Sequence, residues 1–232
     1  MTGMAAELTG LAEGVWTASA PVSFLGLQLT STMTVLRLAD GNLLVHSPIE
    51  LTPERRAAVE ALGTVAHVYA LNLFHHLRAD EWLAAFPSAR FHAPRTLPKK
   101  RPDLRVDRAH ADGSEPAFTN SVDELPIDGF RLDETVLFHR PSSTLVVADL
   151  VHNIGRPEHG WTKFYSRTMG FYDRVALSRF IRWSSFSDRA AARRSLDALL
   201  ALPFERVILG HGAPLEAGAR EALATAYAWL KS

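Results

Sequence analysis

Residues 145–150 read Leu-Val-Val-Ala-Asp-Leu, an apolar run that is typical of a buried β-strand and ends on one carboxylate, Asp149. Residues 207–212, Val-Ile-Leu-Gly-His-Gly, repeat this pattern and end on His211 between two glycines. A polar side chain directly after a buried strand needs a partner, since burying it alone costs free energy. Both stretches therefore indicate strands whose carboxyl ends carry functional side chains.

A third apolar run, Val65–Leu71, is followed by a loop that contains two consecutive histidines, His75 and His76. In open α/β sheets, ligands bind in the crevice at the carboxyl ends of the strands. We therefore expect this loop to converge with Asp149 and His211 on one cleft.

The residues available for a metal site are limited by composition. The chain has no cysteine and ten histidines. Disulfides, thiolate zinc sites and iron–sulfur clusters are therefore excluded, and any transition metal must be bound by His, Asp or Glu. Two imidazoles and one carboxylate suit zinc, iron or manganese, and three protein ligands leave positions open for water.

The first half of the sequence predicts a set of strands with helices after them. Strands are expected at Val22–Leu29, Met33–Leu38, Leu43–Val45 and Val65–Leu71. Thr52 and Pro53 start a helix, because a capping hydroxyl precedes proline at the first helical position, and Gly63 ends it. A short helix is expected at Asp80–Phe86, and Arg95–Asp112 is expected to be a loop.

The second half repeats this order. Strands are expected at Val122–Ile127, Thr135–His139, Thr144–Ala148 and Val207–Leu209. Asp188 is expected to cap a helix over Arg189–Leu200, and a last helix is expected over Leu215–Leu230. The aromatic stretch His152–Trp183 is expected to be irregular, and its Trp161–Trp183 part is a candidate for a substrate pocket, a subunit contact or the core.

Two successive sets of strands, each ending in a strand–loop–helix unit, predict an α/β (α+β) fold. Two mixed β-sheets packed face to face with helices outside, an αββα sandwich, fit this order, and a doubly wound sheet is the competing topology. No stretch of the 232 residues has the composition of a linker, so we expect one domain over residues 1–232.

The order of these motifs resembles that of the metallo-β-lactamase superfamily. The resemblance rests on the hairpin Arg37–Val45, the His-bearing loop Asn72–Leu77, and the runs Leu145–Leu150 and Val207–Gly212. It extends over Val15–Leu230 and implies an αββα fold with a metal site. The chain resembles most a divergent, uncharacterised branch in which a His-His pair stands in place of the HxHxDH motif.

Departures from the superfamily motif affect its first metal site. The six motif positions fall on Asn72, Leu73, Phe74, His75, His76 and Leu77. Two ligand positions of the first metal therefore carry Asn72 and Phe74, and the third falls near Arg131. The resemblance thus implies that the first metal site is lost.

The second metal site is kept in part, according to the same resemblance. His76 takes the motif Asp position, Asp149 the bridging Asp position and His211 the C-terminal His position, whereas Leu77 replaces the site's own motif histidine. We therefore expect one divalent ion, with zinc first and iron or manganese as alternatives, held by His76, Asp149 and His211. A register shift of one residue would put His75 in place of His76.

Three further histidines are candidates for catalytic roles. His75, His139 and His152 would orient the metal ligands or relay protons, and each also has a structural interpretation as a loop or core imidazole. His46 falls where the superfamily often has an aspartate, and a structural role is expected for it.

The bulk composition bears on partners and location. The chain has 25 basic and 25 acidic side chains and zero net charge, so it has no overall attraction to nucleic acid or to anionic membranes. The basic run Pro98–Arg101 lacks stacking aromatic residues, so nucleic acid is not expected as a partner. There is no signal-peptide pattern and no apolar run long enough to span a membrane. We expect a cytoplasmic protein that acts on a small molecule, as a monomer or an oligomer.

Three functions are compatible with these features. The first is a metal-dependent hydrolase with a reduced, single-metal site and a substrate that lies against the Trp161–Trp183 segment. The second is a non-catalytic binding or scaffold protein that kept the fold and lost the chemistry, since Asn72 and Phe74 replace ligands. The third is a non-haem iron redox protein, because two histidines and one carboxylate also suit iron.

Overall fold

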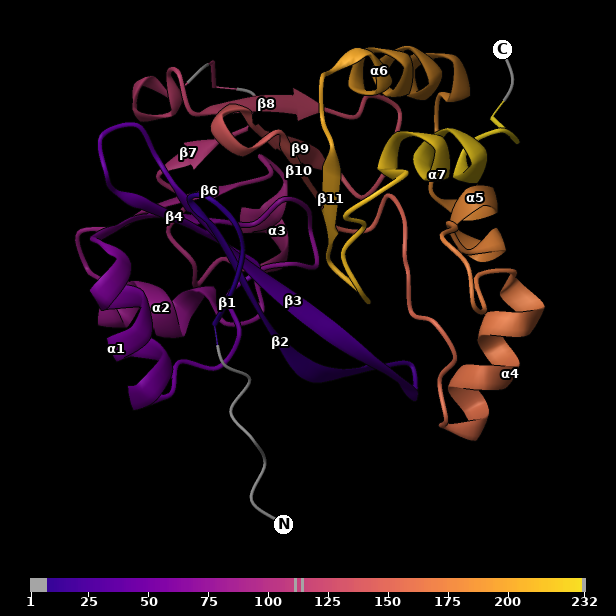
Figure 1. Ribbon diagram of the computed structural model, residues 1–232, viewed down its shortest axis with the longest axis horizontal. Coiled ribbons are helices and arrows are strands. Elements are labelled where there is room, and N and C mark those ends of the chain that lie inside the picture. The colour runs from indigo at the N-terminus through magenta and orange to yellow at the C-terminus, as the bar shows by residue number, and fades with distance from the viewer. Residues whose placement is uncertain (1–7, 111, 114, 231–232) are drawn as a thin grey trace.

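Two β-sheets form the centre of the structure, a computed structural model that describes residues 8–110, 112–113 and 115–230 (Figure 1). Within these residues, the first sheet has seven strands in chain order, which are β1 (Thr9–Ala12), β2 (Val15–Phe24), β3 (Leu27–Arg37), β4 (Leu43–His46), β5 (Val65–Tyr69), β6 (Arg90–Ala93) and β7 (Arg108–Ala109). The second sheet has four described strands in the order β11 (Arg206–Leu209), β10 (Thr144–Val147), β9 (Thr135–His139) and β8 (Val122–Pro126). The described part leaves out residues 1–7, 111, 114 and 231–232. Both ends of the expected domain and one residue of the expected 95–112 loop are among them.

Both sheets are mixed. In the first sheet, the strands from β1 to β4 pair antiparallel, whereas those from β4 to β7 pair parallel. In the second sheet, β10 pairs parallel with β11 and antiparallel with β9, which in turn pairs antiparallel with β8. The prediction of two mixed sheets is therefore confirmed.

Apolar side chains fill the space between the two sheets. Leu36, Leu44 and Tyr69 from the first sheet belong to one buried cluster with Leu137 and Val146 from the second. Helices cover the outer faces (Figure 1), with α1 (Pro53–Leu62) and α2 (Ala79–Ala85) on the first sheet and α6 (Arg189–Ala201) and α7 (Ala219–Ala226) on the second. Each layer buries its apolar face against the next, so the αββα sandwich is confirmed.

Helix starts that depend on local sequence agree with the prediction. Thr52 accepts a hydrogen bond from the backbone N–H of Arg55 at 3.2 Å and caps α1, which Gly63 ends. Asp188 accepts one from the backbone N–H of Ala191 at 2.9 Å and caps α6. No helix in the described part of the chain is long and apolar enough to cross a membrane.

The first hairpin corrects the prediction of a strand over Val22–Leu29. A tight turn at Leu25 and Gly26, with φ of 49° and 76°, divides that segment between β2 and β3. Two-residue hairpins use left-handed turn residues because the backbone twist then matches that of the strands. The β2–β3 hairpin is consequently longer than predicted, and its tip extends away from the sheet (Figure 1).

Two segments that were expected to be irregular contain regular elements. Arg95–Asp112 includes α3 (Leu97–Lys100) and β7, and His152–Trp183 includes α4 (Gly160–Met169) and α5 (Arg179–Ser184). The strand β6 was not predicted, and α7 is shorter than Leu215–Leu230 because Leu215 pairs with β11. These elements are short, so tertiary packing rather than local propensity stabilises them.

Candidate metal centre

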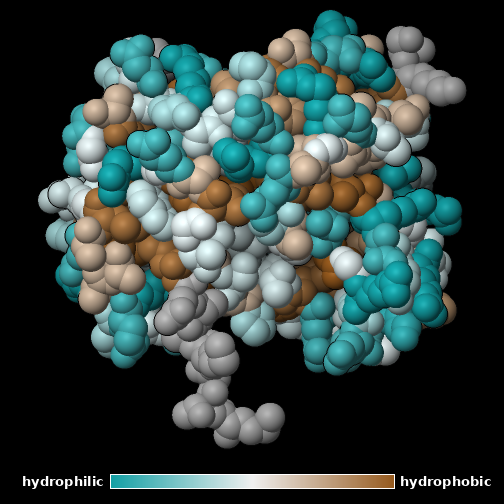
Figure 2. Space-filling model, viewed as in Figure 1, coloured by the Kyte–Doolittle hydropathy of each residue, from teal (hydrophilic) through white to brown (hydrophobic). Residues whose placement is uncertain are grey.

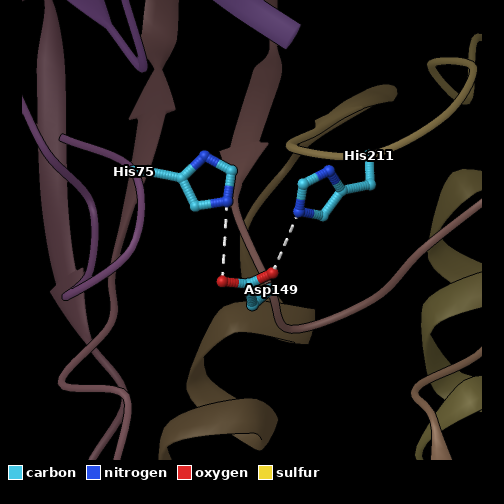
Figure 3. Close-up of side chains that lie close together, drawn as sticks. All are labelled: His75, Asp149 and His211. Atoms are coloured by element: carbon cyan, nitrogen blue, oxygen red, sulfur yellow. Dashed lines mark ion pairs between the residues drawn. The ribbon is translucent and has the colours of Figure 1, made fainter. Parts of the chain in front are cut away.

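Three side chains from three loops meet at one place in the structure (Figure 3). The Nε2 atom of His75 lies 3.5 Å from Asp149 Oδ2, and the Nε2 atom of His211 lies 3.4 Å from Asp149 Oδ1. One ligand atom from each residue can be chosen so that all three lie within 4.8 Å of one another. This is a group that could hold a metal ion.

The strand arrangement explains why these loops converge. The strands β10 and β11 are parallel neighbours in register, with Val147 opposite Leu209, so Asp149 and His211 each follow two residues later at the same sheet edge. His75 comes from the loop after β5 in the other sheet. A backbone hydrogen bond from Thr32 in β3 to the carbonyl of Gly210, at 3.0 Å, joins the two sheets beside the group.

Hydrogen bonds hold both imidazoles in orientation. His211 donates from Nδ1 to the backbone carbonyl of Thr30 at 2.7 Å, and this bond orients the ring so that Nε2 faces Asp149. The Nδ1 atom of His75 lies 2.8 Å from the hydroxyl oxygen of Ser47, so its Nε2 atom also faces the carboxylate. The site therefore presents two ring nitrogens and a carboxylate to one point.

A buried network positions the carboxylate. The side-chain amide of Asn72 donates to Asp149 at 2.8 Å and to Glu134 at 2.9 Å. Glu134 also accepts the backbone N–H groups of Ala148 and Asp149, both at 2.8 Å. Burial and then the nearby charge of Asp149 raise the pKa of Glu134 to about 7. Asn72 thus holds the carboxylate of Asp149 in place.

The charges in the group support each other. Burial by itself raises the pKa of Asp149, but His75 and His211 outweigh this effect and hold that pKa well below its usual range. Burial likewise lowers the pKa of His211, but the hydrogen bond and charge of Asp149 raise it above its usual value. The carboxylate is therefore ionised at neutral pH and is available as a ligand.

His76, which was expected as a ligand, lies outside this group. Its Nδ1 atom is 3.3 Å from a guanidinium nitrogen of Arg101, and its buried Nε2 atom has no hydrogen-bond partner among the described residues. Burial, together with the cations Lys100 and Arg101, lowers the pKa of His76. The structure corrects the register by one residue, because consecutive side chains in this turn point in different directions and His75 is the one that faces Asp149.

The other predicted site residues lie at different distances from the group. His139 is at the far end of the second sheet, paired with Thr144 in β10, and its ring bonds to Ser142 and to the carbonyl of Arg37. The antiparallel register therefore takes His139 away from Asp149, and the structure corrects its expected role beside the ligands.

His152 and His46 do lie beside the group. The ring centroid of His152 is 5.5 Å from that of His211, and the ring centroid of His46 is 5.7 Å from that of His75. Burial and then the charge of His211 lower the pKa of His152 to about 4, so it is neutral at pH 7. Arg131, near which the resemblance places the third ligand of the first metal, is exposed.

The residues that support the group of His75, Asp149 and His211 were not predicted from the sequence. Glu134, Ser47 and Thr30 have no motif context, although a glutamate directly before a fully buried strand was a detectable signal for Glu134. Gly210, one of the two glycines that flank His211, is required by a close approach of neighbouring atoms. A Cβ atom there would lie 2.5 Å from His75 Cε1 and 2.8 Å from the carbonyl oxygen of Ala148.

Apolar side chains flank the group on one side. Phe24 and Leu25 at the tip of the β2–β3 hairpin and Trp161 in α4 are exposed, and the indole of Trp161 donates to the carbonyl of Leu25 at 3.2 Å. Phe24 also contacts Phe74, the neighbour of His75, with ring centroids 6.0 Å apart. Figure 2 shows hydrophobic surface between the hairpin and α4 on this face of the molecule.

The donor set fits a transition-metal ion. Two imidazoles and one carboxylate are ligands that zinc, iron and manganese accept, and one ligand atom from each of the three residues lies within 4.8 Å of the other two. Two mixed sheets in an αββα sandwich, with this group at the strand ends, define the metallo-β-lactamase fold.

Comparisons with known proteins agree with this class. The chain belongs to the family described as "Domain of unknown function (DUF4336)", whose model matches residues 12–171. A metallo-β-lactamase from Pontibacter korlensis is similar in structure, with a TM-score of 0.66 and 10% identity over 97% of this chain and 98% of that one. A metallo-β-lactamase from Erythrobacter litoralis has a TM-score of 0.61 and 12% identity over 99% and 94% of the two chains.

A third similar structure is the Flv1 flavodiiron core from Synechocystis sp. PCC6803. Its TM-score is 0.67 at 14% identity, over 97% of this chain and 60% of that one. A comparison with curated protein sequences found no match. At these identities the structural comparisons show the fold alone.

Proposed function

We propose that the chain is a metal-dependent hydrolase with a single metal ion held by His75, Asp149 and His211. The observation that supports this most is the convergence of two oriented Nε2 atoms on one ionised, buried carboxylate. A divalent ion bound there supplies a Lewis acid and an activated water. Only one ion is proposed, because Asn72, Phe74 and Leu77 offer no ligand nitrogen or carboxylate at the remaining motif positions.

The residues around the ligands have separate tasks in this proposal. Asn72 and Glu134 keep Asp149 in place, so the carboxylate does not have to reorganise during the reaction. His152, whose ring centroid lies 5.5 Å from that of His211, would help to orient the attacking water. The apolar surface of Phe24 and Trp161 excludes water from one side and contacts an apolar part of a small-molecule substrate.

An iron-dependent redox function is the second candidate. Two histidines and one carboxylate are the donor set of many non-haem iron sites. The structural similarity to a flavodiiron core supports keeping this candidate, although it concerns the fold only. The identity of the bound metal separates the two functions, since zinc favours hydrolysis and iron favours redox chemistry.

Elemental analysis of the full chain tests the proposed site. The protein is purified without an affinity-tag metal, and His75→Ala and His211→Ala are compared with His76→Ala, which changes the adjacent histidine. We expect about one ion per chain in the unaltered protein and in His76→Ala, and loss of the ion in the other two variants. Loss in His76→Ala with retention in His75→Ala would reverse the assignment. A protein that neither contains nor takes up metal would instead be a binding or scaffold protein.

A further inference from the structure

A cavity of about 470 Å³ lies away from the candidate metal ligands, between α7 and the segment that leads into α5. These two helices lie side by side in Figure 1. Arg174 and Arg182 line the cavity on one side, and Glu221 and Thr225 of α7 line it on the other. Its size is within the range of small-molecule sites, about 300–1,000 Å³.

Two arginines line this cavity and a third, Arg179, lies next to one of them, and no described acidic side chain pairs with any of the three. Arg174 and Arg179 both lie over Gly170, where a Cβ atom would be 3.0 Å from Arg174 Nη2 and 3.2 Å from Arg179 Nε. Both guanidinium groups also act on Arg182, because burial and then these two charges lower its pKa. Within the part of the chain that the structure describes, no carboxylate lies within 4.0 Å of any of the three.

The hydrogen bonds of these arginines leave donors free. Each guanidinium donates only to a backbone carbonyl, with Arg174 bonding to Gly170, Arg179 to Thr168 and Arg182 to Leu177. A guanidinium has five N–H donors in a planar fork that matches the oxygens of phosphate. The cluster therefore has unused donors and mutual repulsion, both of which an anion would relieve.

The balance of charge indicates which anion fits. Arg174, Arg182 and Glu221, which line the cavity, and Arg179, which lies next to Arg174 outside the lining, together carry a formal charge of +2, and a phosphate monoester with a charge of about −1.5 to −2 at pH 7 would neutralise it. Glu221 would repel a phosphate placed beside it, but it accepts hydrogen bonds from hydroxyl or ammonium groups, as does Thr225. The two sides of the cavity thus differ in the groups that they favour.

We propose that this cavity binds a small organic phosphate. The phosphate lies against Arg174 and Arg182, and the polar remainder of the molecule lies against Glu221 and Thr225. The proposal does not depend on the metal site. The backbone of Ala176 lines the same cavity and forms a bridge to His152, so the ligand would lie behind the strand-like segment next to the candidate metal centre.

Isothermal titration calorimetry with inorganic phosphate and with glycerol phosphate tests the proposal on the full chain. Arg174→Gln is compared with Arg56→Gln, which removes one positive charge from another exposed arginine, in α1. We expect saturable binding of glycerol phosphate, weakened roughly tenfold or more in Arg174→Gln, which corresponds to about 1.4 kcal/mol, and unchanged in Arg56→Gln. Thermal melting of each variant shows whether it is folded.

Glu221→Gln gives a second, opposite readout. Removing this carboxylate should strengthen the binding of inorganic phosphate, because repulsion is lost, while glycerol phosphate gains less because it also loses an acceptor. The proposal is overturned if neither compound binds saturably to the folded protein, or if Arg56→Gln weakens binding as much as Arg174→Gln does. Binding that is indifferent to Glu221→Gln would also overturn the assigned orientation.

Discussion

His75 and His76 are neighbours in the chain but have different chemical surroundings. His75 faces the carboxylate of Asp149, whereas His76 faces the guanidinium of Arg101. A nearby carboxylate stabilises the protonated form of an imidazole, whereas a nearby guanidinium destabilises it. One residue of register in a turn therefore decides which histidine faces Asp149, and no periodicity in the sequence records it.

Gly210 provides a test at this scale. In Gly210→Ala, the new methyl group would lie 2.5 Å from the His75 ring, so the imidazole must move away from Asp149. We expect metal affinity to fall about 10–100-fold, with a loss of about 1–3 kcal/mol in the free energy of unfolding. Metal titration and chemical denaturation measure the two effects.

Gly160→Ala is the matched control, because a Cβ atom there has nothing within 4 Å. It should leave metal affinity unchanged. If Gly210→Ala binds metal with the affinity of the unaltered protein, the position of the His75 ring does not determine metal binding, and the prediction is wrong.

At the scale of elements, the helices whose starts are marked by a capping side chain begin where the sequence predicts them. The starts of α1 and α6 depend on Thr52 and Asp188, whose side chains bond to backbone N–H groups only three residues later. The elements that were missed, β6, α4 and α5 among them, have weak patterns and depend on packing against distant parts of the chain. In α4, for example, Thr162 accepts a hydrogen bond from the backbone of Gln28 in β3 at 2.9 Å.

The cap of α6 can be tested by substitution. Asp188→Ala removes the acceptor for the Ala191 N–H group, so we expect a loss of about 1 kcal/mol in the free energy of unfolding. Asp188→Asn keeps a capping oxygen and should cost much less. Urea denaturation of both variants measures the difference, and equal losses would show that the charge, rather than the cap, stabilises this helix start.

At the scale of the whole molecule, buried polar contacts as well as apolar packing join the two sheets. Arg108 in β7 pairs with Glu124 in β8 at 2.6 Å, and the hydroxyl of Tyr69 in β5 donates to Glu124 at 2.5 Å. His92 and His110 stack on the ring of Tyr69. Because the sheets share this interior, we propose that the whole chain is one domain.

The buried histidines predict loss of stability in acid. Burial, together with neighbouring cationic groups, lowers the pKa of His92 to about 2 and that of His110 to about 3. In the unfolded chain both pKa values return to about 6.5, so the unfolded state binds more protons below that pH. Their stabilising contribution is therefore complete above pH of about 6.5 and is lost as the pH falls toward the folded pKa values.

Urea denaturation of the metal-free protein at several pH values below about 6.5 measures this effect. Each histidine adds a slope of up to about 1.4 kcal/mol per pH unit. In His92→Gln the slope of the unfolding free energy against pH should be smaller by the amount that corresponds to about one bound proton, because one titrating group is gone. An unchanged slope in this variant would show that His92 does not contribute to the acid transition.

The sequence by itself determined the class of fold and the general position of the site. Apolar runs that end on Asp149 and His211 predict strand ends, because an isolated polar side chain after a buried strand is costly. The αββα order, the caps of α1 and α6, and the β9–β10 connection follow from signals within a few residues of each other. Such signals act through local backbone geometry and need no distant partner.

Only the tertiary structure decided which side chains meet. It placed His75 rather than His76 beside Asp149, took His139 to the far end of its sheet, and brought Asn72 and Glu134 together behind the carboxylate. It also brought Arg174 and Arg182 to one cavity with α7. These contacts join residues far apart in the chain, so they depend on sheet register and turn direction, which the sequence pattern does not specify to one residue.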